Sequence, residues 1–321
     1  MRFLIYGAGF IGVGLAERLS AKGHSVLLAK RAGTRPRPLI AEALRDLPYM
    51  KYGDPAEPLR AYRPDVAVNA VGAIGGGELW AANAEFPRRL CKAAEEAGWR
   101  GKLVHISAVA VTGPSGVEEE LHLSGVRPAG AFAESKVEGE RAVAACGRWD
   151  WAIVRPGVVY GPYNDHDEWS LLARLAKLGL APRLDLRLPA ISITDLSAVV
   201  ELAASSVSRD FFFAVECEPL AFDAVVEALE EAAGRRLRRI PAPLGLASLL
   251  APGPVRGLLG LAKLSFSCEK AKRLLGIAPR YKRSDMVKMF KLLLKSVSGA
   301  QRPASAPPRP SRSSHGVCRR S

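Results

Sequence analysis

Short apolar runs alternate with amphipathic stretches along the first half of the chain. Runs of five to seven residues rich in Val, Leu, Ile and Ala predict buried strands at 2–6, 25–29, 65–71, 103–107 and 151–155. Between them, apolar residues at helical spacing predict helices, one ending at Gly23 and others over 79–97 and 134–146. Apolar strands that alternate with helices are typical of a parallel sheet covered on both faces. The pattern therefore predicts an α/β fold with a doubly wound parallel sheet.

The second half of the chain has a weaker pattern. Helices are predicted over 168–178, 195–206 and 221–233, and a strand over 211–216. We expect a sheet domain over 1–165 with returning segments near 190–215, a small, mostly helical substrate-side domain over 166–295, and a basic tail over 296–321. The tail is almost entirely Ser, Pro, Ala and Arg, which leave little to bury, so it is predicted to be disordered.

Charged residues are distributed unevenly along the chain, with a boundary near residue 233. Of the 321 residues, 48% are hydrophobic and 24% charged, which excludes a wholly disordered protein. The net charge is +14, yet residues 1–233 carry 26 basic and 30 acidic side chains, whereas residues 234–295 carry 15 basic and 2 acidic. A negatively charged partner at the C-terminal end is therefore expected, either a phosphorylated substrate or a membrane surface. No aromatic residue interleaves the basic residues of 297–321, which argues against nucleic acid.

Cysteine spacing and apolar segments bear on the compartment. The five cysteines lie far apart and form no CxxC pair, so neither a zinc cluster nor a disulfide scaffold is predicted, and a reducing cytoplasm is favoured. Residues 240–255 are uncharged but include four prolines, too short and too broken for a membrane span. Residues 243–264 are interpreted as a buried helical pair, with peripheral membrane contact as the alternative. The apolar start is not interpreted as a secretion signal, because spaced glycines interrupt it.

A glycine pattern directly after the first strand carries the first chemical signal. Gly7, Gly9 and Gly12 form GxGxxG between a predicted strand and a predicted helix. The first glycine permits a tight turn, the second lets the backbone approach a pyrophosphate, and the third allows close packing of helix on sheet. Free N–H groups at the helix start would hold the anion. The sequence therefore predicts a dinucleotide site in a Rossmann-type domain.

The end of the second strand bears on the type of dinucleotide. An NAD site has Asp or Glu there to bind the ribose 2′-hydroxyl, whereas this chain has Lys30 and Arg31. Two cations can pair with a 2′-phosphate, which favours NADP(H) over NAD(H). The alternative is that both residues only open a basic loop, since Arg35 and Arg37 follow.

Seven segments carry a resemblance to a known family. They are Gly7–Gly12, Gly53-Asp54, Asn69–Gly72, Trp80–Glu85, Arg155–Pro162 (similar to RPxxVYGP), Ile193–Leu196, and Phe266–Pro279 with its Lys-Ala and Leu-Leu-Gly elements. Together they resemble the extended short-chain dehydrogenase/reductase superfamily, in its NAD-dependent epimerase/dehydratase group, over about residues 1–295. Within that group the similarity is nearest to the dTDP-4-dehydrorhamnose reductases.

The resemblance implies roles for individual residues. Phe10 and Ile11 would line the pyrophosphate turn with the three glycines, and Asp54 would meet the adenine. Further cofactor contacts are implied for Ala70, Val71, Gly72, Asn83 and Pro156. Lys136 would hold the nicotinamide ribose; in the family this lysine also lowers the pKa of a tyrosine four residues earlier.

The chain departs from the family pattern where the proton transfer takes place. The family has Tyr-x-x-x-Lys, but here the segment reads Phe132 to Lys136, and the family's Ser or Thr is Ala108. Phenylalanine has no ionisable proton, and losing one general acid costs about 100- to 10,000-fold in rate. Ser107, His105 and Tyr160 are the candidates to replace the missing hydroxyls.

Two functions remain open from the sequence. One is an epimerase/dehydratase-like oxidoreductase acting on a small molecule such as a sugar nucleotide. The other is a non-catalytic NADP(H)-binding accessory or regulatory subunit, associated with a membrane or a larger complex. The resemblance also implies a homodimer formed through the helix that holds Lys136. No metal site is predicted.

Overall fold

A computed structural model describes residues 1–113, 125–147, 149–242, 257 and 259–299. Its centre is a seven-stranded sheet with all neighbouring strands parallel, in the order β11-β6-β5-β4-β1-β2-β3. The strands are β1 (Arg2–Tyr6), β2 (Ser25–Arg31), β3 (Tyr49–Tyr52), β4 (Val66–Asn69), β5 (Lys102–Ile106), β6 (Asp150–Pro156) and β11 (Asp210–Ala214). The predicted Rossmann-type α/β fold is confirmed.

Helices cover both faces of this sheet. The covering elements are α1 (Phe10–Ala21), α2 (Pro38–Ala43), α3 (Ala56–Tyr62), the π turn η1 (Ala81–Glu85) leading into α4 (Phe86–Glu96), the 3₁₀ turn η2 (Val109–Thr112), α5 (Ala131–Ala144), α7 (Ile193–Ser206) and α11 (Glu269–Leu275). Alternation along β1 explains the two layers, because Phe3 and Ile5 pack with α1 and α7 while Leu4 and Tyr6 pack on the side of α4 and α5. Two separate apolar cores therefore flank the sheet.

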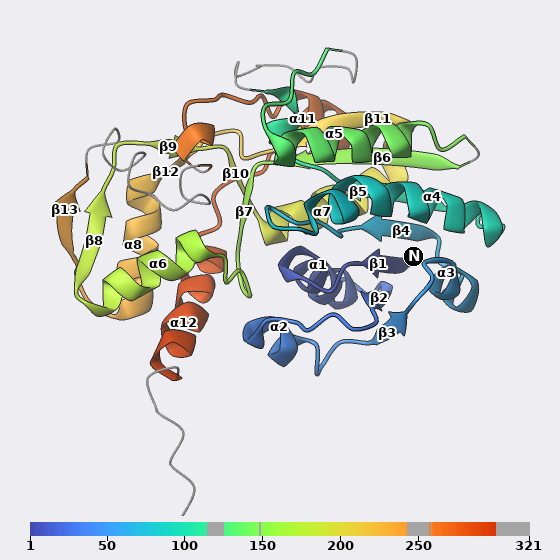
Figure 1. Ribbon diagram of the computed structural model, residues 1–321. Coiled ribbons are helices and arrows are strands. Elements are labelled where there is room, and N and C mark those ends of the chain that lie inside the picture. The colour runs from blue at the N-terminus through green and yellow to red at the C-terminus, as the bar shows by residue number, and fades with distance from the viewer. Residues whose placement is uncertain (114–124, 148, 243–256, 258, 300–321) are drawn as a thin grey trace, which may run out of the picture.

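The C-terminal part lies beside the sheet and has its own core (Figure 1). It contains α6 (Asp167–Lys177), α8 (Phe222–Ala233), α12 (Arg283–Gly299) and three two-stranded pairs, β7 (Val158–Tyr160) with β10 (Ala190–Ser192), β9 (Arg187–Leu188) with β12 (Leu220–Ala221), and β8 (Leu180–Arg183) with β13 (Arg238–Pro241). Trp169 and Phe290 pack edge to face at its centre. From β10 the chain returns through α7 to β11 at the sheet edge.

Element boundaries differ from the sequence predictions at several points. Helix α12 extends to Gly299 and so enters the segment predicted as a disordered tail. The rest of that tail, 300–321, lies outside the described residues, as does most of the apolar segment 243–264. In the described part of the chain, no helix has the length and apolar character needed to cross a bilayer.

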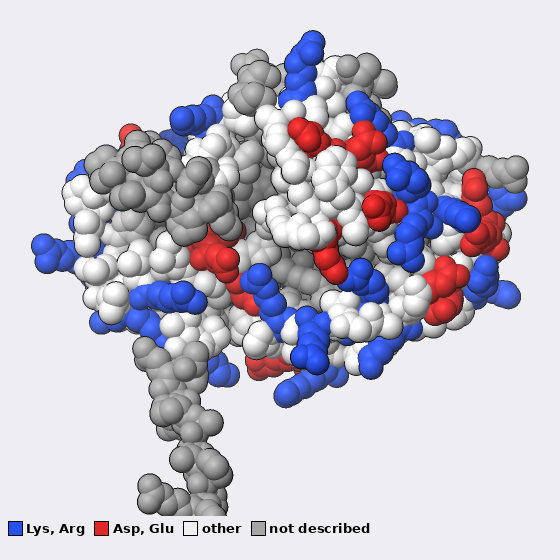
Figure 2. All heavy atoms as spheres, in the orientation of Figure 1, with Lys and Arg blue, Asp and Glu red and all other residues white. Residues whose placement is uncertain are grey.

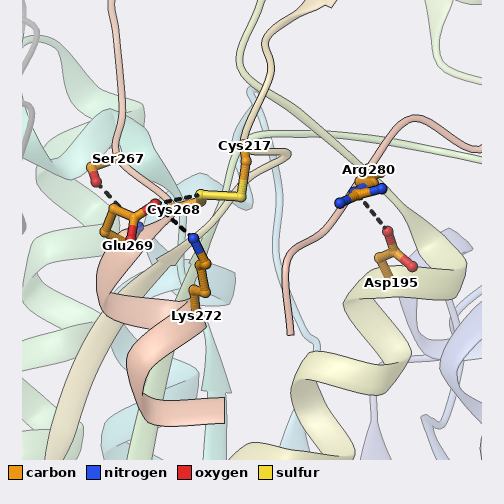
Figure 3. Close-up of a disulfide and its surroundings, with 7 residues drawn as sticks. All are labelled: Asp195, Cys217, Ser267, Cys268, Glu269, Lys272 and Arg280. Atoms are coloured by element: carbon orange, nitrogen blue, oxygen red, sulfur yellow. Dashed lines mark hydrogen bonds and ion pairs between the residues drawn. A yellow bond between two sulfur atoms is a disulfide. The ribbon is translucent and has the colours of Figure 1, made fainter. Parts of the chain in front are cut away.

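The prediction that the cysteines form no disulfides is wrong. Cys91 pairs with Cys146, and Cys217 pairs with Cys268 (Figure 3). The partners are 55 and 51 residues apart in the chain, and only the packing of α4 on α5 and of α11 near β11 brings them together, so spacing could not reveal them. Disulfides persist in oxidising surroundings. Cysteine spacing therefore no longer supports a cytoplasmic location, which stays a prediction.

A buried ion pair joins α5 to the sheet. Arg155 on β6 donates from Nε to Glu140 Oε1 at 3.0 Å and from Nη2 to Glu140 Oε2 at 2.7 Å, and neither side chain is exposed. The guanidinium also stacks over the Phe211 ring of β11, 4.3 Å from its centre. Two parallel hydrogen bonds join the guanidinium to the two carboxylate oxygens, and they offset the cost of removing both charges from water.

Replacing Glu140 with Ala leaves the Arg155 charge buried without its carboxylate. We expect the free energy of unfolding to fall by about 3–5 kcal/mol, measured by denaturant unfolding. The control is Glu138→Ala, because Glu138 pairs with Arg141 at the surface of the same helix and its loss costs at most about 1 kcal/mol. Equal losses in the two variants would contradict the assigned role of the buried pair.

Candidate functional site

The glycine turn after β1 is built for a close approach of backbone and ligand. Gly7 has a φ of +104°, and a Cβ there would lie 2.8 Å from the carbonyl of Ala70. A Cβ on Gly12 would lie 1.8 Å from the Gly7 oxygen, so neither position tolerates a side chain. Gly9, in contrast, faces open space. The turn is thus packed tightly against backbone at Gly7 and Gly12 and is open at Gly9, as the close approach of a pyrophosphate would require.

Helix α1 begins at this turn without a side chain that satisfies its first N–H groups. Its N-cap is Gly9, which offers no capping oxygen, and its first turn holds no acidic residue. Phe10 is buried, with its ring 6.4 Å from the ring of His166, and Ile11 is partly buried. The first N–H groups of α1 therefore have no side-chain cap, an arrangement that favours anions in other proteins.

The two cations at the end of β2 have partners in the structure. Lys30 Nζ donates to the Thr34 carbonyl at 2.5 Å, within its own loop. Arg31 Nη2 donates to both carboxylate oxygens of Glu78, at 3.0 and 2.8 Å. Figure 2 shows basic and acidic side chains interspersed on one face of the molecule. Both cations remain near the surface.

The ends of β3 and β4 supply the other predicted cofactor contacts. Asp54 Oδ1 accepts from the Ala56 N–H at 3.1 Å at the start of α3, and its side chain is half exposed. Beyond β4, Ala70 N–H donates to the Tyr6 carbonyl. Val71 N–H donates to Asn69 Oδ1 at 3.1 Å, which fixes the direction of the strand's continuation.

Asn83 connects this continuation to α5. Its Oδ1 accepts from Ala73 N–H at 3.0 Å, while its Nδ2 donates to the Ala73 carbonyl at 2.8 Å and to Ser135 Oγ at 3.1 Å. Ser135 Oγ in turn donates to the carbonyl of Phe132. The buried amide of Asn83 therefore holds the loop after β4 against the helix that carries Lys136.

Lys136 reaches the same place from the opposite side. Its Nζ donates to the Ile106 carbonyl at 3.2 Å, and a Cβ on Gly72 would lie 3.1 Å from that Nζ. Glycine at position 72 thus leaves room for the ammonium group. Burial lowers the pKa of Lys136 to about 8, although the nearby Glu140 carboxylate opposes this shift.

His105 and Ser107 are two buried polar residues at the end of β5. Asn69 faces His105 across β4 and β5, and its Nδ2 lies 3.0 Å from His105 Nδ1. Because Asn69 Oδ1 is bound to Val71 N–H, the amide donates to Nδ1 and the ring proton resides on Nε2. Burial, with a contribution from Lys136, lowers the pKa of His105 to about 3, so the ring is neutral. Within the described residues, His105 Nε2 and Ser107 Oγ have no hydrogen-bond partner.

The positions that would carry the family's hydroxyls are apolar. Phe132 is half-buried on the first turn of α5, one turn before Lys136, and Ala108 immediately precedes η2. Tyr160 lies elsewhere, in the core of the C-terminal part, where its hydroxyl donates to Glu216 Oε1 at 2.6 Å and accepts from Lys282 N–H at 2.8 Å. Burial raises the pKa of Tyr160 far above its usual value. Pro156 is buried at the end of β6.

Sequence reasoning missed three residues of the site. Glu78 was not singled out because an isolated Glu after a glycine run has no pattern of its own, and the partnership of Asn69 with His105 depends on strand register. Glu140 lies four residues after Lys136, a spacing that would have placed it on the same helical face. In the described part of the chain, no three His, Cys, Asp or Glu side chains gather in a way that could hold a metal ion.

Comparisons with known proteins identify the family and the fold. A model of the NAD dependent epimerase/dehydratase family matches residues 3–233, and the chain belongs to that family. A search of curated proteins finds no match.

Solved structures share the fold at low sequence identity. A putative epimerase from Burkholderia cenocepacia has 22% identity and a TM-score of 0.72, with 92% of this chain and 98% of that chain covered. UDP-glucuronic acid 4-epimerase from Bacillus cereus, in complex with UDP-glucuronic acid and NAD, has 18% identity and a TM-score of 0.72, covering 92% and 100%. UDP-glucose 4-epimerase from Thermotoga maritima, with UDP-glucose, has 15% identity at the same TM-score and coverage. At these identities the likeness establishes the fold.

The pKa of Lys136 predicts a pH dependence of stability. The unfolded chain keeps this proton up to about pH 10.5, whereas the folded protein releases it above about pH 8, so in that window the unfolded state binds more protons. Stability should therefore rise with pH across the window, by roughly 3 kcal/mol at about 1.4 kcal/mol per pKa unit.

Denaturant unfolding of wild type and Lys136→Met between pH 8 and pH 10.5 measures this rise. The Met variant should lack it, and Lys92→Met, on the exposed face of α4, should keep it. The same slope in wild type and Lys136→Met would show that another group is responsible.

Proposed function

We propose that this protein binds a nicotinamide dinucleotide, NADP(H) in preference to NAD(H), and acts as a slow oxidoreductase on a nucleotide sugar. The observation that carries the proposal is the contrast between the two halves of the site. The glycine turn, the free start of α1, Asn83 and Lys136 are all in place, while the two hydroxyl positions hold Phe132 and Ala108. Binding is thus supported more fully than rapid proton transfer.

Each half has a distinct chemical role in this proposal. When bound, the nicotinamide would donate or accept the hydride. Gly7, Gly9 and Gly12 would hold the pyrophosphate against the start of α1, and Lys136 would donate to the nicotinamide ribose. Two buried polar groups, Ser107 Oγ and the His105 Nε2–H, have no partner in the described residues. They would be available to take part in the proton transfer. The substrate class is inferred from the UDP-sugars that the Bacillus cereus and Thermotoga maritima epimerases contain.

A non-catalytic accessory subunit is the second candidate. Phe132 and Ala108 favour it, because together they remove both hydroxyls at which the family transfers a proton. The same binding half would then hold a structural or sensing nucleotide. The homodimer, the larger complex and the membrane contact stay predictions.

Restoring the phenol distinguishes the two functions. Phe132→Tyr should raise the turnover of UDP-sugars by about 100-fold over a measurable wild-type rate, since a general acid contributes about 10²–10⁴. Turnover in Phe132→Tyr with none in wild type would favour the accessory subunit. A wild-type rate that the tyrosine leaves unchanged would mean that another group already transfers the proton, and Ser107→Ala would then be the next variant.

The cofactor preference is tested by charge reversal at the end of β2. In Lys30→Glu, the ratio of the Kd for NADPH to the Kd for NADH should rise about tenfold or more, because hydrogen bonds to charged groups contribute about 1.5–3 kcal/mol. Calorimetric titration with each nucleotide measures it, and Lys92→Glu is the control with the same charge change far from the turn. An unaltered ratio would leave Lys30 as surface charge, and no binding of either nucleotide to wild type would overturn the proposed function.

A further inference from the structure

The ion pair between Arg31 and Glu78 occupies the position at which this fold distinguishes NADP from NAD. The end of β2 is where a Rossmann domain binds the 2′ group of the adenine ribose, by an acidic side chain for a hydroxyl or by a nearby Arg for a phosphate. Here the Arg is present, but both oxygens of Glu78 lie within 3.0 Å of its Nη2. A carboxylate from the chain itself therefore stands where the phosphate oxygens would bind.

Glu78 is carried by a loop that can move. It follows Gly75, Gly76 and Gly77, and a side chain on any of the three would meet no atom within 4 Å. Gly76 has a φ of +84°, and Ile74 at the loop's start is 57% exposed. The run of glycines has little to hold it, so the energy needed to shift Glu78 is small.

Both ends of this loop are fixed. Ala73 is bound twice by the buried amide of Asn83, and Leu79, which is buried, donates its N–H to the Gly76 carbonyl. Because the Glu78 carbonyl also accepts from the Ala82 N–H, movement is confined to residues 74–77 and the side chain of Glu78. In the described residues the only ion pair of Glu78 is the one with Arg31, so that pair latches the loop to the end of β2.

The latch is weak enough to exchange. The Arg31 side chain is 51% exposed and that of Glu78 is 69% exposed, and ion pairs at such exposure contribute little. A phosphate monoester carries up to two charges and pairs with Arg in a fork, so it is the stronger ligand for the guanidinium. Exchange of the carboxylate for the phosphate is therefore favourable, but the free energy gained is smaller because the ion pair between Arg31 and Glu78 must first break.

We propose that Glu78 is a specificity-determining residue whose carboxylate competes with the 2′-phosphate of NADP(H) for Arg31. This inference rests on the proposed function. Binding of NADP(H) releases the Glu78 side chain from Arg31, whereas NAD(H), which has no 2′-phosphate, leaves the pair intact. The chain thus lowers its own preference for NADP(H) through an internal anion.

The test compares the full-length chain with Glu78→Gln by calorimetric titration with NADPH and with NADH. Removing the competing charge should lower the Kd for NADPH about two- to fivefold and leave the Kd for NADH unchanged. Glu231→Gln is the matched control, because Glu231 pairs with Arg283 at similar exposure, 48% and 51%, on the C-terminal part. It should change neither Kd.

A double-mutant cycle shows whether the effect acts through Arg31. In the Arg31→Gln background, Glu78→Gln should no longer tighten NADPH binding. An unchanged or raised Kd for NADPH in Glu78→Gln overturns the proposal, as does a raised Kd for NADH, which would show that Glu78 binds the ribose hydroxyl. If wild type binds NADPH while Glu78→Gln behaves like it, only this inference fails; if wild type binds neither nucleotide, the proposed function fails with it.

Discussion

The carboxylate of Glu140 and the guanidinium of Arg155 meet where solvent reaches neither group. Such a pair adds little net stability, but it fixes how its two elements sit, because any other arrangement leaves a bare charge inside the protein. One turn earlier on the same helix is Lys136, whose ammonium faces the Ile106 carbonyl at the end of β5. The stacking of Arg155 on Phe211 extends the same constraint to the edge strand β11. The position of the site's lysine thus depends on an ion pair that touches no ligand.

Around that lysine the buried side chains form a polar framework, whereas positions 132 and 108 are apolar. Asn83 fixes the loop after β4 to α5, and Asn69 fixes the tautomer of His105, so two buried amides orient the groups beside Lys136. Side chains that only filled space would not need this network, because unpaired polar groups in a core are destabilising. The framework thus fixes the position of Lys136 relative to Phe132, which lies one turn earlier on α5.

The sequence revealed those features that depend on local pattern. Six of the seven strands of the sheet, all but β3, the glycine turn and the role of Gly12 in packing follow from periodicity and steric demand, and the structure confirms the fold they predict. Features that depend on contacts between distant segments could not be found in this way. The pairing of Asn69 with His105 requires the register of β4 on β5, and the latch of Arg31 on Glu78 spans 47 residues. The disulfides escaped prediction for the same reason, since a cysteine's partner is set by tertiary packing.

Those two disulfides also divide the chain into covalent rings. The first ring, from Cys91 to Cys146, includes β5 and all of α5, and the second, from Cys217 to Cys268, includes α8 and β13. The rings follow one another along the chain and do not overlap. Hydrolysis of one peptide bond inside either ring therefore opens the ring but leaves a single molecule, with α12 still joined to the sheet through sulfur. Only a cut outside the rings, such as one between 147 and 216, yields two fragments with no covalent link between them.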